Sequence, residues 1–159
     1  MIMTTKAPPT IIRPGDGNVS VYEWQNDTIT VILTGAQTAG AFTLTEDRMK
    51  PCFCLGLHMH REHAETFYIL EGEVQFRVHS DEFSAGAGTT VHVPPGTPHA
   101  VRIANGQPGR LLMLYAPAGF EDYLAVLKNL TPEQCADPAF MRALEQRYDN
   151  ITLEDPSQT

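Results

Sequence analysis

Basic residues, cysteines and long apolar runs are all scarce in this 159-residue sequence. Lys and Arg number 11 against 19 Asp and Glu, which gives a formal net charge of -8. Because nucleic-acid-binding proteins neutralise phosphates with basic surfaces, we expect no nucleic-acid partner. No apolar run approaches the roughly 18 residues of a membrane span, and the opening MIMTTKAPPT lacks an apolar segment of signal-peptide length. We therefore also expect no membrane partner.

The few cysteines argue against a disulfide framework. There are three, and two of them, Cys52 and Cys54, alternate within one strand-like segment. Residues two apart in a strand cannot readily bridge to each other, and the third cysteine leaves an odd number. This usage is typical of a reducing compartment, so we predict a cytoplasmic protein.

The chain is long enough for one domain with a hydrophobic core and short for two. Residues 1–18 contain APPT and RPGDGN, which predict a loose N-terminal arm ending in turns. Residues 19–117 consist of short β-prone runs separated by turn residues. Residues 118–159 change character and predict a C-terminal helical extension and tail that packs on the β-domain.

The β-prone runs recur about every ten residues, which is typical of an antiparallel sandwich or barrel rather than of βαβ units. Examples are TITVILTG, ETFYIL, EVQFRV and RLLMLYA. The sequence LEGEV predicts a tight hairpin, in which Gly72 is free to take a positive φ angle. We predict a mainly β fold, a single antiparallel β-sandwich or jelly-roll barrel.

In the tail, Phe120, Tyr123, Leu124 and Leu127 follow helical spacing. The segments TPEQ and DPAF each place a capping residue before proline, which favours a helix start. We expect these helices to pack against the β-domain; a lid over a pocket is the alternative.

Histidines and an acid crowd into the segment GLHMHREHAETFYILEG. In a strand, His58 and His60 point to the same face with their backbones roughly 7 Å apart, so their imidazoles can converge on one metal ion. Glu65 follows five residues later, where a turn can fold it back beside them. An H-x-H pair alone is weak evidence for such a site. However, His99 ends a second hairpin-like stretch, GTTVHVPPGTPHA, whose prolines and glycine hold the backbone at a corner.

The two segments read G-x-H-x-H-x4-E-x6-G and G-x5-P-x-G-x2-H, and together they resemble the two motifs of the cupin family. The resemblance implies that His58, His60, Glu65 and His99 bind one divalent transition metal, namely Fe, Mn, Ni, Co or Zn. Two positions depart from the family pattern, Cys52 and Ile103, where the family often has glycine and asparagine. Neither is a ligand position.

The flanking sequences TAGAFTLTE and LLMLYAPAGFEDYL are similar to those of small single-domain quercetin 2,3-dioxygenase-like cupins. This less specific resemblance covers about residues 17–153. It implies a homodimer, because cupins of this kind commonly pair edge to edge.

The alternation of inward and outward side chains also indicates a substrate pocket. Phe67 and Ile69 share the parity of Glu65 and are candidates for its apolar wall. Cys54 shares the parity of His58 and His60 if the strand is unbroken, so it is a third candidate. We expect His63 to be an exposed turn residue.

The leading functional hypothesis is a metal-dependent dioxygenase that acts on a flavonol-like or other enol-bearing aromatic small molecule. The resemblance suggests that Glu65 acts as both ligand and general base toward the enol proton. One alternative is an oxygen-independent metal-dependent isomerase, cyclase or lyase. Another is a non-catalytic cupin that binds a small molecule.

Overall fold

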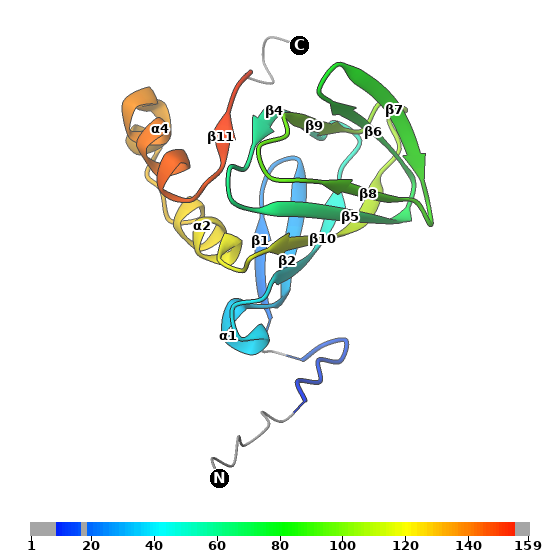
Figure 1. Ribbon diagram of the computed structural model, residues 1–159, viewed down its shortest axis with the longest axis horizontal. Helices are drawn as coiled ribbons and strands as arrows, with labels where there is room; N and C mark the ends of the chain where they lie inside the picture. Colours follow the sequence, from blue (N-terminus) through cyan, green and yellow to red (C-terminus); the bar gives the residue numbers. More distant parts are fainter. Residues whose placement is uncertain (1–8, 17–18, 155–159) are drawn as a thin grey trace.

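The structure is a computed structural model, and it describes residues 9–16 and 19–154. Of the N-terminal arm predicted over residues 1–18, residues 1–8 and 17–18 lie outside the described residues. Two antiparallel sheets form the body of the molecule, and helices near the C-terminus lie to one side of it (Figure 1).

The larger sheet has six strands in the order β1-β2-β3-β10-β5-β8. All its neighbours pair in antiparallel fashion. Its strands are β1 (Ser20–Glu23), β2 (Asp27–Leu33), β3 (Thr43–Met49), β5 (Ala64–Glu71), β8 (Thr90–Val93) and β10 (Gly109–Ala116). The short helix α1 (Gly35–Thr38) connects β2 to β3.

The smaller sheet has five antiparallel strands in the order β11-β4-β9-β6-β7. Its strands are β4 (Cys54–Met59), β6 (Glu73–Val78), β7 (Asp81–Gly86), β9 (His99–Arg102) and β11 (Ile151–Thr152).

Alternating side chains from the two sheets build the core. Along β10, every second residue from Gly109 to Tyr115 is buried, as expected for a strand with one face on the core. Phe67 of the larger sheet and Phe76 of the smaller one meet edge to face, with ring centroids 5.1 Å apart. The predicted antiparallel β-sandwich with a short C-terminal helical extension is confirmed.

The C-terminal segment contains α2 (Phe120–Leu127), α3 (Pro132–Ala136) and α4 (Pro138–Arg147). The two predicted helix starts are confirmed, because the side chains of Thr131 and Asp137 cap α3 and α4 and proline follows each. In the described residues, no helix has both the length and the apolar character needed to cross a membrane.

Strand β11 is a feature that the sequence analysis does not anticipate. After α4 the chain turns back and pairs with β4, so that Thr152 lies opposite His58 (Figure 1). Two residues are too few to show a periodic pattern, and their extended conformation comes from the free edge that β4 offers. The tail is thereby held beside the strand that carries the H-x-H motif.

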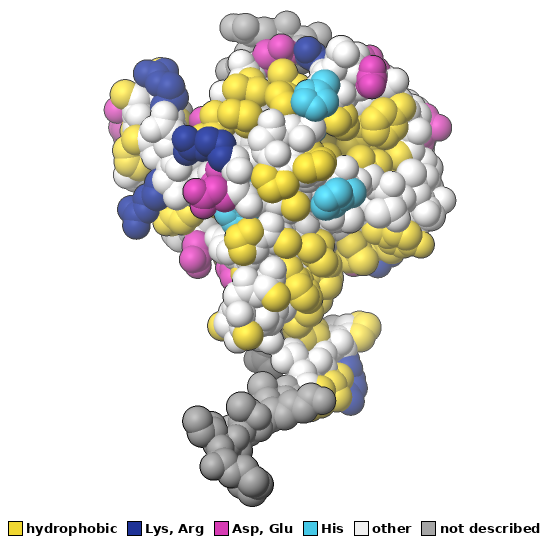
Figure 2. Space-filling model, in the orientation of Figure 1, with side chains coloured by type: hydrophobic (Ala, Val, Ile, Leu, Met, Phe, Trp, Pro, Cys, Tyr) yellow, Lys and Arg dark blue, Asp and Glu magenta, His cyan; other side chains and the backbone are white. Residues whose placement is uncertain are grey.

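The face of the molecule seen in Figure 2 carries its basic side chains unevenly. On the face seen in Figure 2, Lys and Arg side chains gather mainly over the helical part at the left, and hydrophobic and uncharged side chains dominate over the sheets. That face offers no continuous basic stripe. The absence of a nucleic-acid partner stays a prediction.

Candidate metal centre and its cavity

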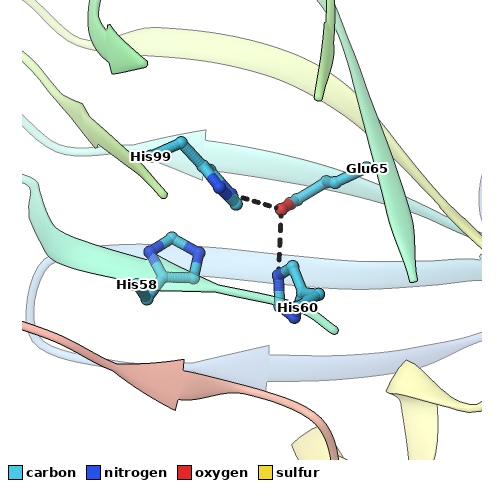
Figure 3. A group of neighbouring side chains, drawn as sticks. All are labelled: His58, His60, Glu65 and His99. Atoms are coloured by element: carbon cyan, nitrogen blue, oxygen red, sulfur yellow. Dashed lines mark hydrogen bonds and ion pairs between the residues drawn. The ribbon is translucent and has the colours of Figure 1, made fainter. Parts of the chain in front are cut away.

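Three strands bring four polar side chains together between the sheets. His58 lies on β4, His60 directly after it, and Glu65 near the start of β5. His99 begins β9 and lies opposite His58 in the antiparallel ladder. The four side chains converge in Figure 3, with Glu65 reaching across from the larger sheet. The alternation rule thus places His58 and His60 as predicted, and strand pairing adds His99.

The cluster is compact and almost inaccessible to solvent. One potential ligand atom from each of the four residues lies within 4.8 Å of all the others. The exposed fractions are 4% for His58, 2% for His60, 2% for Glu65 and 0% for His99. Such a concentration of buried polar groups is unfavourable unless hydrogen bonds or an ion compensate it.

Each imidazole is oriented by a backbone carbonyl that accepts a hydrogen bond from its Nδ1 atom. The three pairs are His58 with Gly56 at 2.9 Å, His60 with Asp149 at 2.6 Å, and His99 with Thr97 at 2.9 Å. With Nδ1 protonated, a neutral imidazole presents its lone pair on Nε2. This arrangement is typical of metal-ligating histidines, whose second nitrogen is held by an outer partner.

Contacts within the cluster shift the pKa values of Glu65 and His60. The Oε2 atom of Glu65 lies within hydrogen-bond distance of Nε2 of His60, at 3.1 Å, and of Nε2 of His99, at 2.9 Å (Figure 3). Because Nδ1 of each ring already carries a proton, a proton on Nε2 in either contact makes that imidazole a cation. Burial alone raises the pKa of Glu65, but these bonds and the attached charges outweigh burial and hold that pKa well below its usual range. Burial lowers the pKa of His60, but Glu65 outweighs it and leaves that pKa raised.

His58 differs, because burial and the neighbouring His99 lower its pKa to about 3. It therefore stays neutral and keeps its Nε2 lone pair at ordinary pH. Lone pairs and a carboxylate that converge in this way repel one another unless a proton or cation lies among them. The donor set, three imidazoles and one carboxylate, fits a divalent transition metal.

A turn from the C-terminal segment holds the chain between the ligands. The carboxylate of Asp149 accepts hydrogen bonds from the backbone N–H groups of Arg61, Glu62 and His63 at 2.7, 2.8 and 3.1 Å. It also lies 2.8 Å from Nδ1 of His63, whose side chain is 13% exposed. The expectation of an exposed His63 is therefore wrong, because Asp149 covers its ring.

A cavity of about 320 Å³ opens beside the cluster. His58, His60 and Glu65 lie in its wall. Most of the remaining lining is apolar or aromatic and comes from both sheets and α2. Principal members are Trp24, Ile29, Met49, Phe53, Phe67, Leu111, Met113, Tyr115, Phe120, Tyr123, Leu124 and Leu127. An apolar cavity with a small number of polar groups in its wall is the usual composition of a small-molecule site.

The three predicted pocket residues lie in different places. Phe67 lines the cavity. Ile69 shares its inward parity but lies two residues further along β5, where it is fully buried in the hydrophobic core and is not part of the cavity wall.

Cys54 lies outside the cavity and lines a separate pocket beside Arg77 and Arg102. The cause is a bulge in β4. Leu55 pairs with Val101 and His58 pairs with His99. Between these two pairs, β4 advances by three residues while β9 advances by only two. An extra residue reverses the parity on one side of the bulge. Leu55 therefore lines the cavity instead of Cys54.

The sequence analysis does not predict several of the residues that line the cavity. Asp47 and Asp27 come from β3 and β2, and Tyr115 comes from β10. The alternation of side chains along a strand cannot identify these residues from the sequence. Their strands are separated in the sequence from both motifs, so their inward-facing positions cannot be counted from the ligands. The helical stripe of α2 was expected to pack on the β-domain, and Phe120, Tyr123 and Leu124 do so as part of the cavity wall.

Comparisons with known proteins agree with this architecture. Residues 49–115 match the Cupin domain family. Over 67 residues the chain is 34% identical to an uncharacterized protein of Methanocaldococcus jannaschii, a match that covers 42% of this chain and 54% of that protein. Over 70 residues it is 31% identical to quercetin 2,3-dioxygenase of Bacillus subtilis, covering 44% of this chain and 20% of that enzyme. The matches thus span about half or less of these relatives.

Among solved structures, a predicted oxalate decarboxylase from Thermotoga maritima superposes with a TM-score of 0.60. The sequence identity is 18%, and the match covers 68% of this chain and 99% of that one. At this identity the likeness concerns the fold. The family match spans the strands that carry all four clustered side chains, and the fold agrees with it, so residues 49–115 form a cupin domain.

Proposed function

We propose that this cupin is a metal-dependent dioxygenase that acts on an enol-bearing aromatic small molecule such as a flavonol. The convergence of His58, His60, Glu65 and His99 beside an apolar cavity carries the proposal. The partial match to a quercetin 2,3-dioxygenase supports the substrate class.

The four clustered residues would hold one divalent ion. Bound there, the ion would act as a Lewis acid that lowers the pKa of an enol oxygen. The carbonyls of Gly56, Thr97 and Asp149 keep the three imidazoles in the required tautomer.

Glu65 is the general base of the proposal. Its Oε2 atom faces Nε2 of both His60 and His99, so Oε1 is the oxygen that would take the proton of the enol. Transfer of that proton breaks the enol O–H bond and leaves an electron-rich enolate, the form that reacts with O2. Phe67, Phe120 and Tyr115 supply flat apolar surfaces for an aromatic substrate and limit the access of water.

Oxygen uptake tests the proposal directly. The protein is stripped of metal, reconstituted with Fe, Mn, Co, Ni or Zn, and supplied with flavonols and simpler enols. We expect one metal to support consumption of O2 in proportion to substrate, with both oxygen atoms in the products. The His99→Ala variant should lose this activity. His92→Ala is the matched control, because His92 is exposed and lies outside the cluster.

Two results would count against dioxygenation. Stoichiometric metal with no O2 uptake on any substrate would favour an oxygen-independent enzyme or a binding protein. Undiminished uptake in Glu65→Gln would remove Glu65 as the base and leave it only as a ligand.

A further inference from the structure

We propose that Asp47 forms a second polar subsite of the cavity, which binds a hydroxyl group of the substrate remote from the metal cluster. The inference rests on the proposed function and adds to it the position and chemistry of a second point of recognition. It makes Asp47 a specificity-determining residue.

The first observation is that one carboxyl oxygen of the buried Asp47 has no hydrogen-bond partner among the described residues. The residue is 2% exposed and lies in the cavity wall. The oxygen without a partner is Oδ1. A buried carboxyl oxygen without a partner has lost its hydration without compensation, which destabilises the folded state. A ligand hydroxyl in the cavity would compensate for this loss by donating a hydrogen bond.

The second observation is the position of Asp47 relative to the cluster. Glu65 lies level with Tyr115 and Thr43 across the larger sheet, whereas Asp47 lies four residues further along β3. At about 3.3 Å per residue, the two rows are roughly 13 Å apart along the strands. A substrate of two or three joined rings could therefore place its enol at the cluster and another polar group near Asp47.

The third observation is the charge of the cavity. Its described wall includes four acidic residues, Asp27, Asp47, Glu65 and Glu145, and no Lys or Arg. Anionic substrates are disfavoured in such a cavity because no cation pairs with them. Burial, with a smaller contribution from the negative charges of Asp27 and Glu65, raises the pKa of Asp47 to about 8. A largely protonated carboxyl suits an uncharged hydroxyl, to which it can both donate and accept.

Binding of matched probes tests the subsite without turnover. Zinc-loaded protein is titrated calorimetrically under nitrogen with 3-hydroxyflavone, 3,4′-dihydroxyflavone and 3,7-dihydroxyflavone. The second and third probes each add one hydroxyl, at opposite ends of the molecule. We expect at least one of them to bind about tenfold tighter than 3-hydroxyflavone.

That gain should disappear in Asp47→Leu and persist in Thr45→Val. Thr45 is the matched control because its buried Oγ1 on the same strand also lacks a partner, yet it lies outside the cavity wall. Asp47→Asn, which keeps an acceptor, should retain part of the gain. Each variant is judged by the ratio of its affinity for the dihydroxyflavone to its affinity for 3-hydroxyflavone. A general loss of stability lowers both affinities and leaves this ratio unchanged.

The outcomes separate this inference from the proposed function. If 3-hydroxyflavone binds and neither added hydroxyl helps, or if the gain survives in Asp47→Leu, the subsite is wrong and the enol-binding function stands. If none of the probes binds, both proposals fail for this substrate class.

Discussion

His60 and Asp149, 89 residues apart in sequence, are joined by a 2.6 Å hydrogen bond from the imidazole Nδ1 to the backbone carbonyl oxygen. The side chain of the same aspartate also holds the turn that leads from His60 towards Glu65. One residue of the C-terminal segment thus orients one candidate ligand, His60, and fixes the loop that joins it to another, Glu65.

Replacing Asp149 by alanine should therefore weaken metal binding. The carbonyl remains in Asp149→Ala, but the hydrogen bonds that position it are lost. We expect about a tenfold loss of metal affinity, in the range found for outer-sphere partners. The free energy of unfolding should fall by about 2 kcal/mol, since hydrogen bonds to a charged group are lost. Chelator competition and urea denaturation measure the two effects.

Asp137→Ala is the control for that variant. Its Oδ1 atom caps α4 by accepting from the backbone N–H groups of Ala139 and Phe140. Removing the cap should cost about 1 kcal/mol of stability and leave metal affinity unchanged. Equal losses of metal affinity in the two variants would show that Asp149 acts only through general stability.

Metal addition should stabilise the protein. At a free metal concentration of 100 times Kd, binding adds about 2.7 kcal/mol. For a chain of this length that raises Tm by roughly 5–10 °C. The shift should be reversed by a chelator, be absent in His58→Ala and His99→Ala, and be unaltered in His92→Ala. A shift that survives in both ligand variants would place the metal elsewhere.

The buried Asp47 predicts a pH dependence of stability. Its pKa is raised by burial to about 8 in the folded protein, from 3.8. Between these values the folded state holds a proton that the unfolded state has lost, so stability falls as pH rises from about 4 to about 8. The slope reaches at most about 1.4 kcal/mol per pH unit.

Asp47→Asn removes this titration. In metal-free protein, we expect its stability relative to wild type to increase between pH 5 and pH 8, as measured by urea denaturation at both pH values. Other titrating groups are common to both proteins and largely cancel in the difference. A difference that does not change with pH would show that Asp47 is already ionised in the folded state.

The glycine of the β5–β6 hairpin should be far less replaceable than another with a similar φ angle. Gly72 has φ +80°, and a Cβ atom there would lie 2.7 Å from the carbonyl oxygen of Pro108. Gly88 has φ +87°, and no atom of the described residues lies within 4 Å of its Cβ position. Both Gly→Ala changes cost about 1–2 kcal/mol for the left-handed backbone.

Only Gly72→Ala adds a backbone clash, of about 1–3 kcal/mol. Its free energy of unfolding should thus be lower than that of Gly88→Ala by at least about 1 kcal/mol. Equal free energies of unfolding for the two variants in urea denaturation would mean that the backbone around Pro108 moves aside at no cost.

Strand parity predicts correctly which way some side chains face and incorrectly for another, and the difference has a structural cause. His58 and His60 share a face because they are two residues apart in a nearly regular stretch, and that local rule holds. The same rule fails for Cys54, where a bulge forms between Leu55 and His58. A bulge is set by pairing with β9, so a pattern along one strand cannot show it.

The sequence alone predicts the antiparallel β-class, the helix starts at Thr131 and Asp137, and the four side chains of the cluster. Each follows from short-range spacing, from capping chemistry or from a motif. Only the tertiary structure places Asp47 in the cavity and Asp149 beside His60, and only it pairs Ile151 and Thr152 with β4 as strand β11. These relationships join residues far apart in the chain, and they arise from strand order and packing, which local sequence patterns do not record.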